Sequence, residues 1–116
     1  MSMPLINEAA PAFTANTTHG PRSLADYKGK WLILFSHPAD FTPVCTTEFI
    51  GFAKRAELFK SMNCELLGLS IDSIYSHLAW MQSIQNNFGV EIPFPIIDDI
   101  KMDVVQAYGM IHPGAA

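Results

Sequence analysis

Two apolar runs of strand length constrain the fold most. The first, WLILFS, occupies residues 31–36, and the second, CELLGLSID, occupies residues 64–72. Neither alternates apolar with polar side chains, a pattern typical of strands covered on both faces in a parallel sheet. Because parallel neighbours need a crossover connection, a helix is expected between them. We therefore predict that the two runs are parallel strands, adjacent or nearly so, in the centre of an α/β sheet.

The segments after each run carry the spacing of amphipathic helices. The first helix is predicted to have one apolar face with residues three and four apart, made of Phe49, Phe52, Ala53, Ala56 and Phe59. A second helix is expected over about residues 73–88, with Asp72 or Ser73 as its N-cap and Gly89 just beyond its end. Its apolar stripe is predicted to comprise Ile74, Leu78, Met81, Ile84 or Gln85, and Phe88.

Shorter elements flank these units. A mild alternation over residues 12–18 predicts a short strand, residues 93–99 predict another, and residues 104–109 predict a short helix that ends at a glycine. The order strand, helix, strand, helix, strand, helix is that of an α/β domain. No segment has the composition of a linker, so residues 1–116 are expected to form a single domain.

Charge and hydropathy exclude several classes of protein. The chain is 49% hydrophobic and 16% charged, which favours a packed core over disorder. Its net charge is −4 with no basic cluster, which argues against a nucleic-acid surface. The longest clear apolar run is far shorter than the roughly 20 residues that span a bilayer, and no secretory signal is recognisable. Two cysteines form no disulfide framework, so a cytoplasmic location with both thiols reduced is expected.

The loop after the first strand, HPADFTPVC at residues 37–45, carries the most distinctive chemistry. Functional residues in parallel sheets gather beyond the carboxyl ends of the strands, where this loop lies. Thr42 is a good N-cap and Pro43 a favoured first helical residue, so Cys45 is expected to be the third residue of a helix. There the backbone N–H groups and the helix dipole favour thiolate over thiol. Thr42 and Cys45 also have the spacing of a capping box, so their side chains are expected to meet.

The spacing P-x-x-x-T-x-x-C, here Pro38, Thr42 and Cys45, resembles the signature of the peroxiredoxins, the AhpC/TSA family. The stretch FSHPADFTPVCTTE at residues 35–48 is similar to their one-cysteine subfamily and to related archaeal thiol peroxidases, and the similarity continues through LLGLSIDS, SHLAW and IPFPIIDD. The resemblance implies a thioredoxin-like fold of three α/β/α layers. It also implies that residues 1–116 are the N-terminal part of a longer domain, without the family's last core strands and closing helix.

The resemblance implies a thiol-dependent peroxidase that reduces hydrogen peroxide and organic hydroperoxides in antioxidant defence. Cys45 would attack the peroxide as thiolate and become a sulfenic acid, while Thr42 and the Cys45 backbone N–H hold the peroxide oxygens. Pro38 would exclude water, and His37 and Glu48 would lie near the pocket rim. No cofactor or metal is implied. The implied partners are the peroxide, an external thiol reductant (thioredoxin-like, glutathione or other) and further copies of the chain, as a dimer or a ring of dimers.

A second function class stays open because the family also uses an arginine in a T-V-R segment beyond the third helix. Neither Arg22 nor Arg55 matches that position. The alternative is a non-catalytic thioredoxin-like module for redox sensing or binding, which has lost turnover with the arginine.

Two further residues and one metal set receive simpler interpretations. Cys64 opens the second buried strand and is expected to pack there rather than to resolve a sulfenic acid. His77 lies on a predicted helix and is expected at the surface. A metal site built from His37, Asp40 and Cys45 is disfavoured because the usual paired-ligand spacings are absent.

Overall fold

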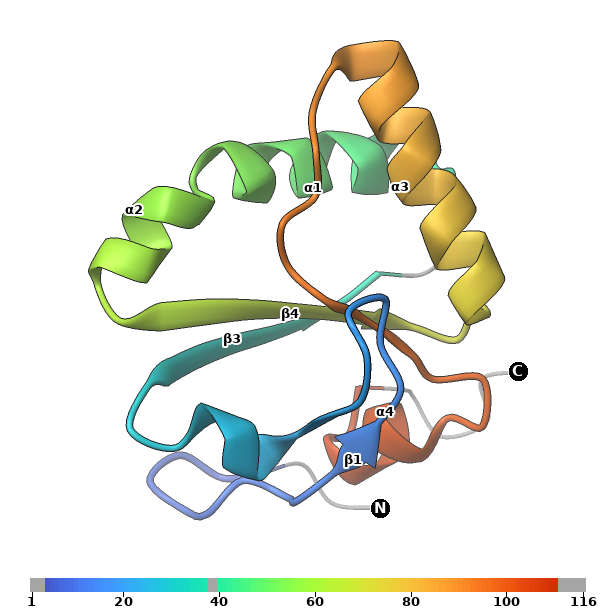
Figure 1. The fold of residues 1–116 in the computed structure, drawn as a ribbon. Coiled ribbons are helices and arrows are strands. Elements are labelled where there is room, and N and C mark those ends of the chain that lie inside the picture. Colours follow the sequence, from blue (N-terminus) through green and yellow to red (C-terminus); the bar gives the residue numbers. More distant parts are fainter. Residues whose placement is uncertain (1–3, 38–39, 111–116) are drawn as a thin grey trace.

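The computed structural model describes residues 4–37 and 40–110 of the chain. Ten elements follow one another along it (Figure 1). They are β1 (Thr14–Ala15), β2 (Arg22–Ser23), a 3₁₀ helix η1 (Leu24–Tyr27), β3 (Trp31–Ser36), α1 (Pro43–Lys54), α2 (Ala56–Ser61), β4 (Cys64–Ser70), α3 (Ile74–Phe88), β5 (Ile96–Asp98) and α4 (Asp103–Ala107).

The main sheet has three described strands in the order β3-β4-β5, and both pairings are parallel. The register between β3 and β4 runs from Trp31 beside Cys64 to Ser36 beside Leu69. The prediction of two neighbouring parallel strands is therefore confirmed. All three strands end at the same edge, which is where the loop that carries Cys45 begins.

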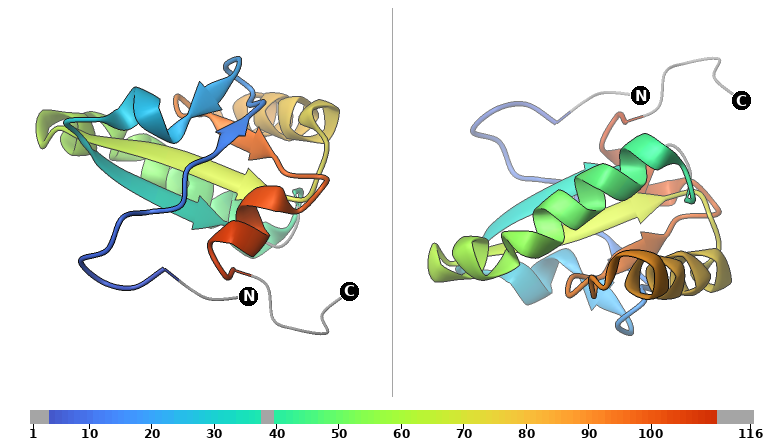
Figure 2. Two further views of the ribbon diagram at one scale, coloured as in Figure 1. Left: turned by 90° about the horizontal axis from the view of Figure 1, so that it is seen from below. Right: turned by 90° about the horizontal axis from the view of Figure 1, so that it is seen from above.

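Each face of the sheet is covered by its own layer. Helices α1, α2 and α3 lie over one face, and η1, the β1–β2 pair and α4 lie over the other (Figures 1 and 2). Successive residues of each strand point to opposite faces, so the sheet has one hydrophobic core on each side. Leu66 and Ile96 pack with Phe49 under the long helices, whereas Leu67 and Ile97 belong to the opposite cluster. The three-layer α/β/α arrangement expected from the sequence is confirmed.

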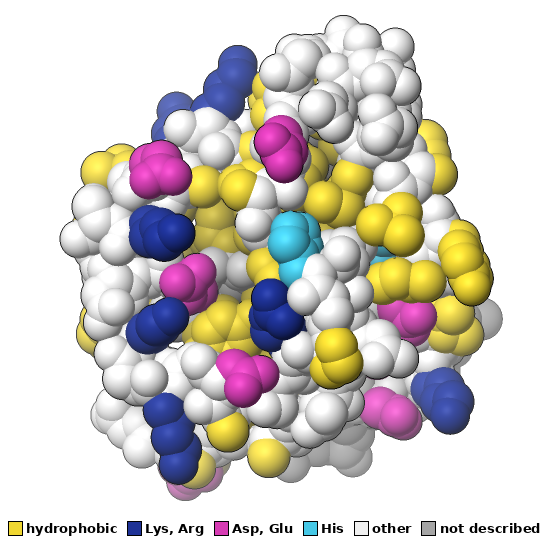
Figure 3. Space-filling model, viewed as in Figure 1, with side chains coloured by type: hydrophobic (Ala, Val, Ile, Leu, Met, Phe, Trp, Pro, Cys, Tyr) yellow, Lys and Arg dark blue, Asp and Glu magenta, His cyan; other side chains and the backbone are white. Residues whose placement is uncertain are grey.

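Charged side chains on the viewed face are mixed in sign. Figure 3 shows lysine or arginine interspersed with aspartate or glutamate, while the far end of α3 is mostly uncharged. This face thus carries no basic patch of the kind that binds nucleic acid.

β3 is covered on both faces, as predicted, because Ile33 and Phe35 pack against one core cluster and Leu32 and Leu34 against the other, but the coverage is only partial. Trp31 is 75% exposed and the following residues are only half-buried, whereas β4 is buried from Leu66 to Ser70. The reason is the sheet order, since β3 pairs with β4 on one side and no described strand pairs with its other edge.

Two helix predictions need correction. The first helix is interrupted at Arg55, which separates α1 from α2. In α3, Leu78 and Phe88 are exposed, and the buried stripe is His77, Trp80 and Ile84. The bounds of α3 are confirmed: the Ser73 side chain accepts a hydrogen bond from the backbone N–H of Ser76, and Gly89 follows the helix in the left-handed conformation, with φ 66°.

Gly68 is the point of closest approach between β4 and the aromatic core. A Cβ atom there would lie 3.1 Å from Phe49 and 3.5 Å from Phe35. Phe49 cannot retreat, because its ring already contacts those of Phe35, Trp80 and Phe94 at centroid distances of 4.6–5.3 Å. We predict that Gly68→Ala lowers the free energy of unfolding by about 1–3 kcal/mol, the usual cost of overpacking a core.

Gly51→Ala is the matched control for this prediction. Gly51 lies inside α1, and a Cβ there would meet only the flexible end of Arg55 at 3.9 Å. Alanine should therefore be neutral or stabilise by up to about 1 kcal/mol through its helix propensity. Urea unfolding of both variants makes the comparison, and a Gly68→Ala protein as stable as the parent would show that the aromatic cluster is not tightly packed.

Candidate active site

Cys45 lies in the first turn of α1, as predicted. Thr42 precedes the helix with extended backbone angles (φ −87°, ψ 143°), and Pro43 is its first residue. The first backbone bond of the helix runs from the N–H of Thr46 to the carbonyl of Thr42 at 2.9 Å. The Thr42 side chain makes no capping hydrogen bond to the backbone of this turn, and the expected meeting of the Thr42 and Cys45 side chains stays a prediction.

The sulfur-bearing turn is held against α3 rather than exposed on a loop. Cys45 is 5% exposed and belongs to the core cluster of Phe49 and Trp80. The indole N–H of Trp80 donates to the Thr46 hydroxyl at 3.0 Å, and the Phe49 and Trp80 rings lie 4.6 Å apart. This cross-helix bond fixes the first turn of α1, and with it Cys45, relative to α3.

Asp40 is the centre of a buried polar network at the carboxyl ends of the strands. Its Oδ1 accepts a hydrogen bond from Nε2 of His37 at 2.6 Å. Its Oδ2 accepts from Nδ1 of His77 at 2.7 Å and from the Ser76 hydroxyl at 2.9 Å. The Asp40 backbone N–H donates to Asp72 at 2.7 Å. One carboxylate therefore ties the end of β3 to the start of α3.

His77 extends this network to β5. Its Nε2 donates to the carbonyl of Ile97 at 2.9 Å, so both ring nitrogens are engaged and the side chain is fully buried. The expectation that His77 lies at the surface is wrong. The physical reason is that Asp40 and Ile97 supply a partner for each nitrogen, which removes the usual penalty for burying a polar ring.

The network changes the acid–base behaviour of both its charged members. Burial alone would lower the pKa of His77, but the hydrogen bond that His77 donates to Asp40 and the negative charge of Asp40 raise that pKa above the usual value. Burial likewise opposes ionisation of Asp40, and the hydrogen bonds from His37 and His77 outweigh it and hold the pKa of Asp40 well below its usual range. The favoured state is thus a charged pair inside the fold.

We predict that stability falls on both sides of a window set by this pair. Below about pH 4 the unfolded chain binds a proton at Asp40 that the folded chain does not, so acid destabilises. Above about pH 6.5 the unfolded His77 has lost a proton that the folded chain keeps, so stability declines again as pH approaches the raised pKa. Urea unfolding at pH 3–9 measures the loss of stability on the acid side and on the alkaline side. Asp40→Asn should flatten them, and an unchanged profile in that variant would contradict the assignment.

His37, Asp40 and His77 also satisfy the geometry of a three-ligand metal group, since their ligand-type atoms lie within 4.8 Å of one another. However, Nε2 of His37 and Nδ1 of His77 both face Asp40 oxygens at hydrogen-bond distance. An ion would have to displace both protons. The arrangement fits hydrogen bonding better, and Cys45, a member of the metal set considered from the sequence, is outside this group.

The remaining site candidates are placed differently. His37 is 6% exposed and its ring packs on Phe49 and Trp80 at centroid distances of 4.9 and 5.0 Å. Glu48 is exposed on α1. Pro38 lies outside the described residues, so its role stays a prediction.

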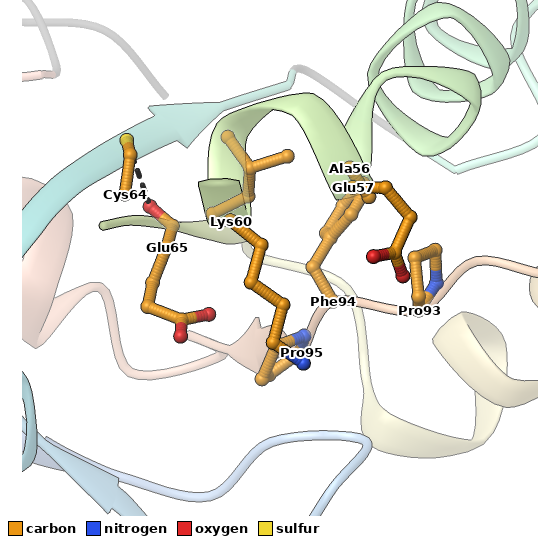
Figure 4. Close-up of a pocket in the computed structure, with 9 residues that line it drawn as sticks. Ala56, Glu57, Lys60, Cys64, Glu65, Pro93, Phe94 and Pro95 are labelled. Atoms are coloured by element: carbon orange, nitrogen blue, oxygen red, sulfur yellow. Dashed lines mark hydrogen bonds between the residues drawn. The ribbon is translucent and has the colours of Figure 1, made fainter. Parts of the chain in front are cut away.

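Cys64 lies at the opposite end of the sheet. It begins β4 beside Trp31, while Cys45 follows the far end of β3 (Figure 1). Figure 4 shows Cys64 at the edge of a pocket between α2 and residues 93–95, with Lys60 and Glu65 nearby. At roughly 3.3 Å per residue, β3 alone separates the two cysteines by on the order of 15 Å, whereas a disulfide needs Cα atoms within about 7 Å. Cys64 therefore cannot pair with Cys45 in this fold.

Sequence reasoning missed the two residues that anchor the network. The sequence offers Asp40 only as a member of a disfavoured metal set and predicts His77 at the surface. The available signal was the spacing of Ile74, His77, Trp80 and Ile84, which is a regular helical stripe that includes a histidine. A buried histidine requires partners, and that requirement points to the acidic residues of the neighbouring loops.

Comparison with known proteins places the chain among the same group of relatives by family model and by sequence. Residues 6–116 match the model of the AhpC/TSA family. The chain is 60% identical over 114 residues to a peroxiredoxin of Aquifex aeolicus, covering 97% of this chain and 51% of that protein. A peroxiredoxin of Methanosarcina mazei is 58% identical over 121 residues, with 98% and 55% covered.

Among solved structures, the yeast mitochondrial 1-Cys peroxiredoxin superposes with a TM-score of 0.87 at 47% identity, covering 94% of this chain and 52% of that one. The chain thus spans about half the length of these relatives. Within the described ranges, none of the helices is long and apolar enough to cross a membrane.

Proposed function

The chain belongs to the AhpC/TSA family of peroxiredoxins, and we propose on that basis that its Cys45 reduces hydrogen peroxide and organic hydroperoxides. The Cys45 thiolate attacks one peroxide oxygen, the S–O bond forms as the O–O bond breaks, and the cysteine becomes a sulfenic acid. The other oxygen leaves with the bonding electron pair and takes up a proton to give water or an alcohol. The position of Cys45 at the third residue of α1 is the observation that carries this proposal.

The start of α1 supports the role of the surrounding groups. The N–H groups of Val44 and Cys45 precede the helical hydrogen-bond ladder, whose first bond is made by Thr46. They would face the oxygen on which negative charge develops, with the Thr42 hydroxyl beside them. Pro38 would shield the sulfur from water, and Glu48 would stand at the rim.

The reductant is proposed to be an external thiol. Cys64 lies too far from Cys45 to resolve the sulfenic acid within the chain, as the sheet register shows. Glutathione or a thioredoxin-like protein fits this requirement, and the yeast mitochondrial relative is described as being resolved by the glutathione and thioredoxin systems. A cytoplasmic location and assembly into dimers or rings of dimers stay predictions.

The second candidate, a redox sensor without turnover, is favoured by one observation. Both arginines of the chain bond to their own surroundings: Arg22 to the carbonyl of Pro21 and Arg55 to that of Gly51. Arg55 is also ten residues beyond Cys45, about 15 Å along a helix. Neither is placed to neutralise charge at the sulfur.

Product analysis tests the proposal. One equivalent of hydrogen peroxide should add a single oxygen to the protein, trapped as a sulfenic acid by a dimedone probe. Cys64→Ser should retain this product and Cys45→Ser should lose it. An internal Cys45–Cys64 disulfide as the main product would refute the one-cysteine mechanism. Repeated consumption of peroxide with glutathione or thioredoxin present supports the enzyme, whereas one equivalent consumed and no more supports the sensor.

A further inference from the structure

β3 leaves one margin of the main sheet open. It pairs with β4 on one side, no described strand pairs with its other edge, and Figure 2 shows it as the outermost strand. We propose that this edge binds a second copy of the chain. Two β3 strands pair antiparallel about a two-fold axis and form one continuous sheet in the order β5-β4-β3-β3-β4-β5. This interaction does not depend on the chemistry proposed for Cys45.

The opposite margin of the sheet, at β5, is covered by the chain itself. The backbone N–H of Thr18 donates to the carbonyl of Ile96 at 3.1 Å, and the N–H of Asp98 donates to the carbonyl of Asn16 at 3.1 Å. Natural sheets protect their edges in this way because unpaired backbone groups attract strands of other chains. The contrast between the two margins makes β3 the one at which pairing with another molecule is expected.

The backbone groups that β3 offers follow from its bonds to β4. The N–H of Trp31 donates to the carbonyl of Asn63 at 3.0 Å, and the N–H of His37 donates to that of Leu69 at 3.0 Å. Odd-numbered residues of β3 therefore direct their backbone groups toward β4, and the residues between them direct theirs to the other side. The groups that point to the open edge belong to Leu32, Leu34 and Ser36.

Residues 31–36 carry none of the features that usually protect an open edge. The segment WLILFS contains neither a charged residue nor a proline. At its start, the Lys30 ammonium lies 3.4 Å from the carboxylate of Glu65, so that charge is paired with β4. Trp31 is 75% exposed, and so is most of Met62, which precedes the Asn63 that binds the Trp31 backbone. Exposed apolar side chains beside an open edge favour contact with another protein.

The side chains of β3 determine what can cover its edge. Ile33 and Phe35 pack against the core under the long helices, and Leu32 and Leu34 pack against the opposite core. A strand added beside them must therefore be apolar on both faces. β3 itself is such a strand. A two-fold axis perpendicular to the sheet also keeps each face of the second copy on the same side as in the first, so both cores continue across the interface.

The proposed register is centred on Ile33. Leu32 then lies opposite Leu34 of the second copy, and the two residues exchange backbone hydrogen bonds through the groups that point to the open edge. Trp31 lies opposite Phe35, which places the exposed indole beside a second aromatic ring. A register centred one residue later would move Trp31 past the end of the second β3 and leave the indole uncovered.

Amide hydrogen exchange, followed by NMR at low and at high protein concentration, tests the pairing. In dilute protein the N–H groups of Leu32 and Leu34 should exchange fast, while those of Ile33 and Phe35, which bind β4, stay protected. In concentrated protein all four should be protected, because association buries the open edge. Protection of Leu32 and Leu34 at both concentrations would overturn the proposal, since the edge would then be covered within one chain. Fast exchange at both would overturn it as well.

Two lysine variants locate the interface in sedimentation experiments. Trp31→Lys places a charge on the open edge and should shift the chain from dimer to monomer. Tyr75→Lys is the matched control, because Tyr75 is an equally exposed aromatic residue on α3, over the β5 side of the sheet. It should leave the dimer intact. A dimer that survives Trp31→Lys, or one that Tyr75→Lys also dissociates, would contradict the assignment to β3, as would assembly beyond a dimer.

A cysteine pair tests the register in a Cys45→Ser/Cys64→Ser background. Ile33 would face itself across the two-fold axis with Cα atoms about 4.5 Å apart, so Ile33→Cys should give a covalent dimer when diamide oxidises the two thiols. Leu34→Cys should not, because its two copies would lie beyond the roughly 7 Å that a disulfide spans. A covalent dimer from Leu34→Cys and none from Ile33→Cys would refute the register centred on Ile33.

Discussion

Asp40→Ala is expected to lower the free energy of unfolding by about 3–5 kcal/mol, the range measured when one partner of a buried ion pair is removed. The substitution leaves three donors without their acceptor: Nε2 of His37, Nδ1 of His77 and the hydroxyl of Ser76. Each buried donor that loses its partner costs about 1–3 kcal/mol. The side chains of Asp40 and His77 are 1% and 0% exposed, so water cannot replace the lost bonds without opening the structure.

A double-mutant cycle separates this pair from general packing loss. His77→Ala should also destabilise the fold strongly, because it leaves the buried Asp40 carboxylate without its charged partner. The double variant Asp40→Ala/His77→Ala should lose clearly less free energy of unfolding than the two single variants added together. The surface pair of Lys30 and Glu65, 3.4 Å apart with side chains 43% and 35% exposed, is the matched control. Glu65→Gln should cost less than about 1 kcal/mol. Additive effects at Asp40 and His77 would mean that the two residues stabilise the fold independently.

The sequence predicted the elements whose causes are local. The bounds of β3 and α3 and the helical position of Cys45 follow from short-range chemistry: an apolar run, a serine N-cap, a left-handed glycine and a proline at the first helical residue. The parallel pairing of β3 with β4 followed from the helix between them. These inferences needed no knowledge of distant residues, which is why the structure confirms them.

What the sequence did not predict depends on contacts between distant segments. His77 and Asp40 are 37 residues apart, and the helical stripe that marks His77 as buried does not identify Asp40 as its partner. The charge pair makes a histidine a core residue and rotates the buried stripe of α3 toward it, away from Leu78 and Phe88. The exposure of β3 likewise depends on the order of strands in the sheet, not on the composition of the strand.

Extending residues 1–116 with the rest of a longer relative is expected to raise the rate of peroxide reduction about a hundredfold, the effect of supplying one charged group to a transition-state pocket. The proposed experiment fuses the remaining segment of the Aquifex aeolicus peroxiredoxin after Ala116. The two proteins are 60% identical over an alignment that covers 97% of this chain and 51% of that relative. The segment taken from the relative should therefore pack against residues 1–116. The family resemblance places an arginine in a T-V-R segment beyond the residues compared, and Arg22 and Arg55 donate to the carbonyls of Pro21 and Gly51 instead.

The same fusion should change how the protein associates. Among the described strands, β3 pairs only with β4, and its other edge carries Trp31 at 75% exposure. An open strand edge beside apolar surface favours pairing with another chain. We therefore expect the 116-residue chain to self-associate in sedimentation experiments and to melt at a lower temperature than the fusion.

A fusion in which the T-V-R arginine is replaced by glutamine separates the two effects. It should keep the higher melting temperature, because the added strands still cover β3, but its rate of peroxide reduction should return toward that of the 116-residue chain. If the glutamine fusion is as fast as the arginine fusion, the gain comes from ordering the loop around Cys45 and not from the charge. If the 116-residue chain already matches both fusions in rate, the chemistry is complete in the start of α1 and the network of Asp40, and the arginine is not needed for the attack on peroxide.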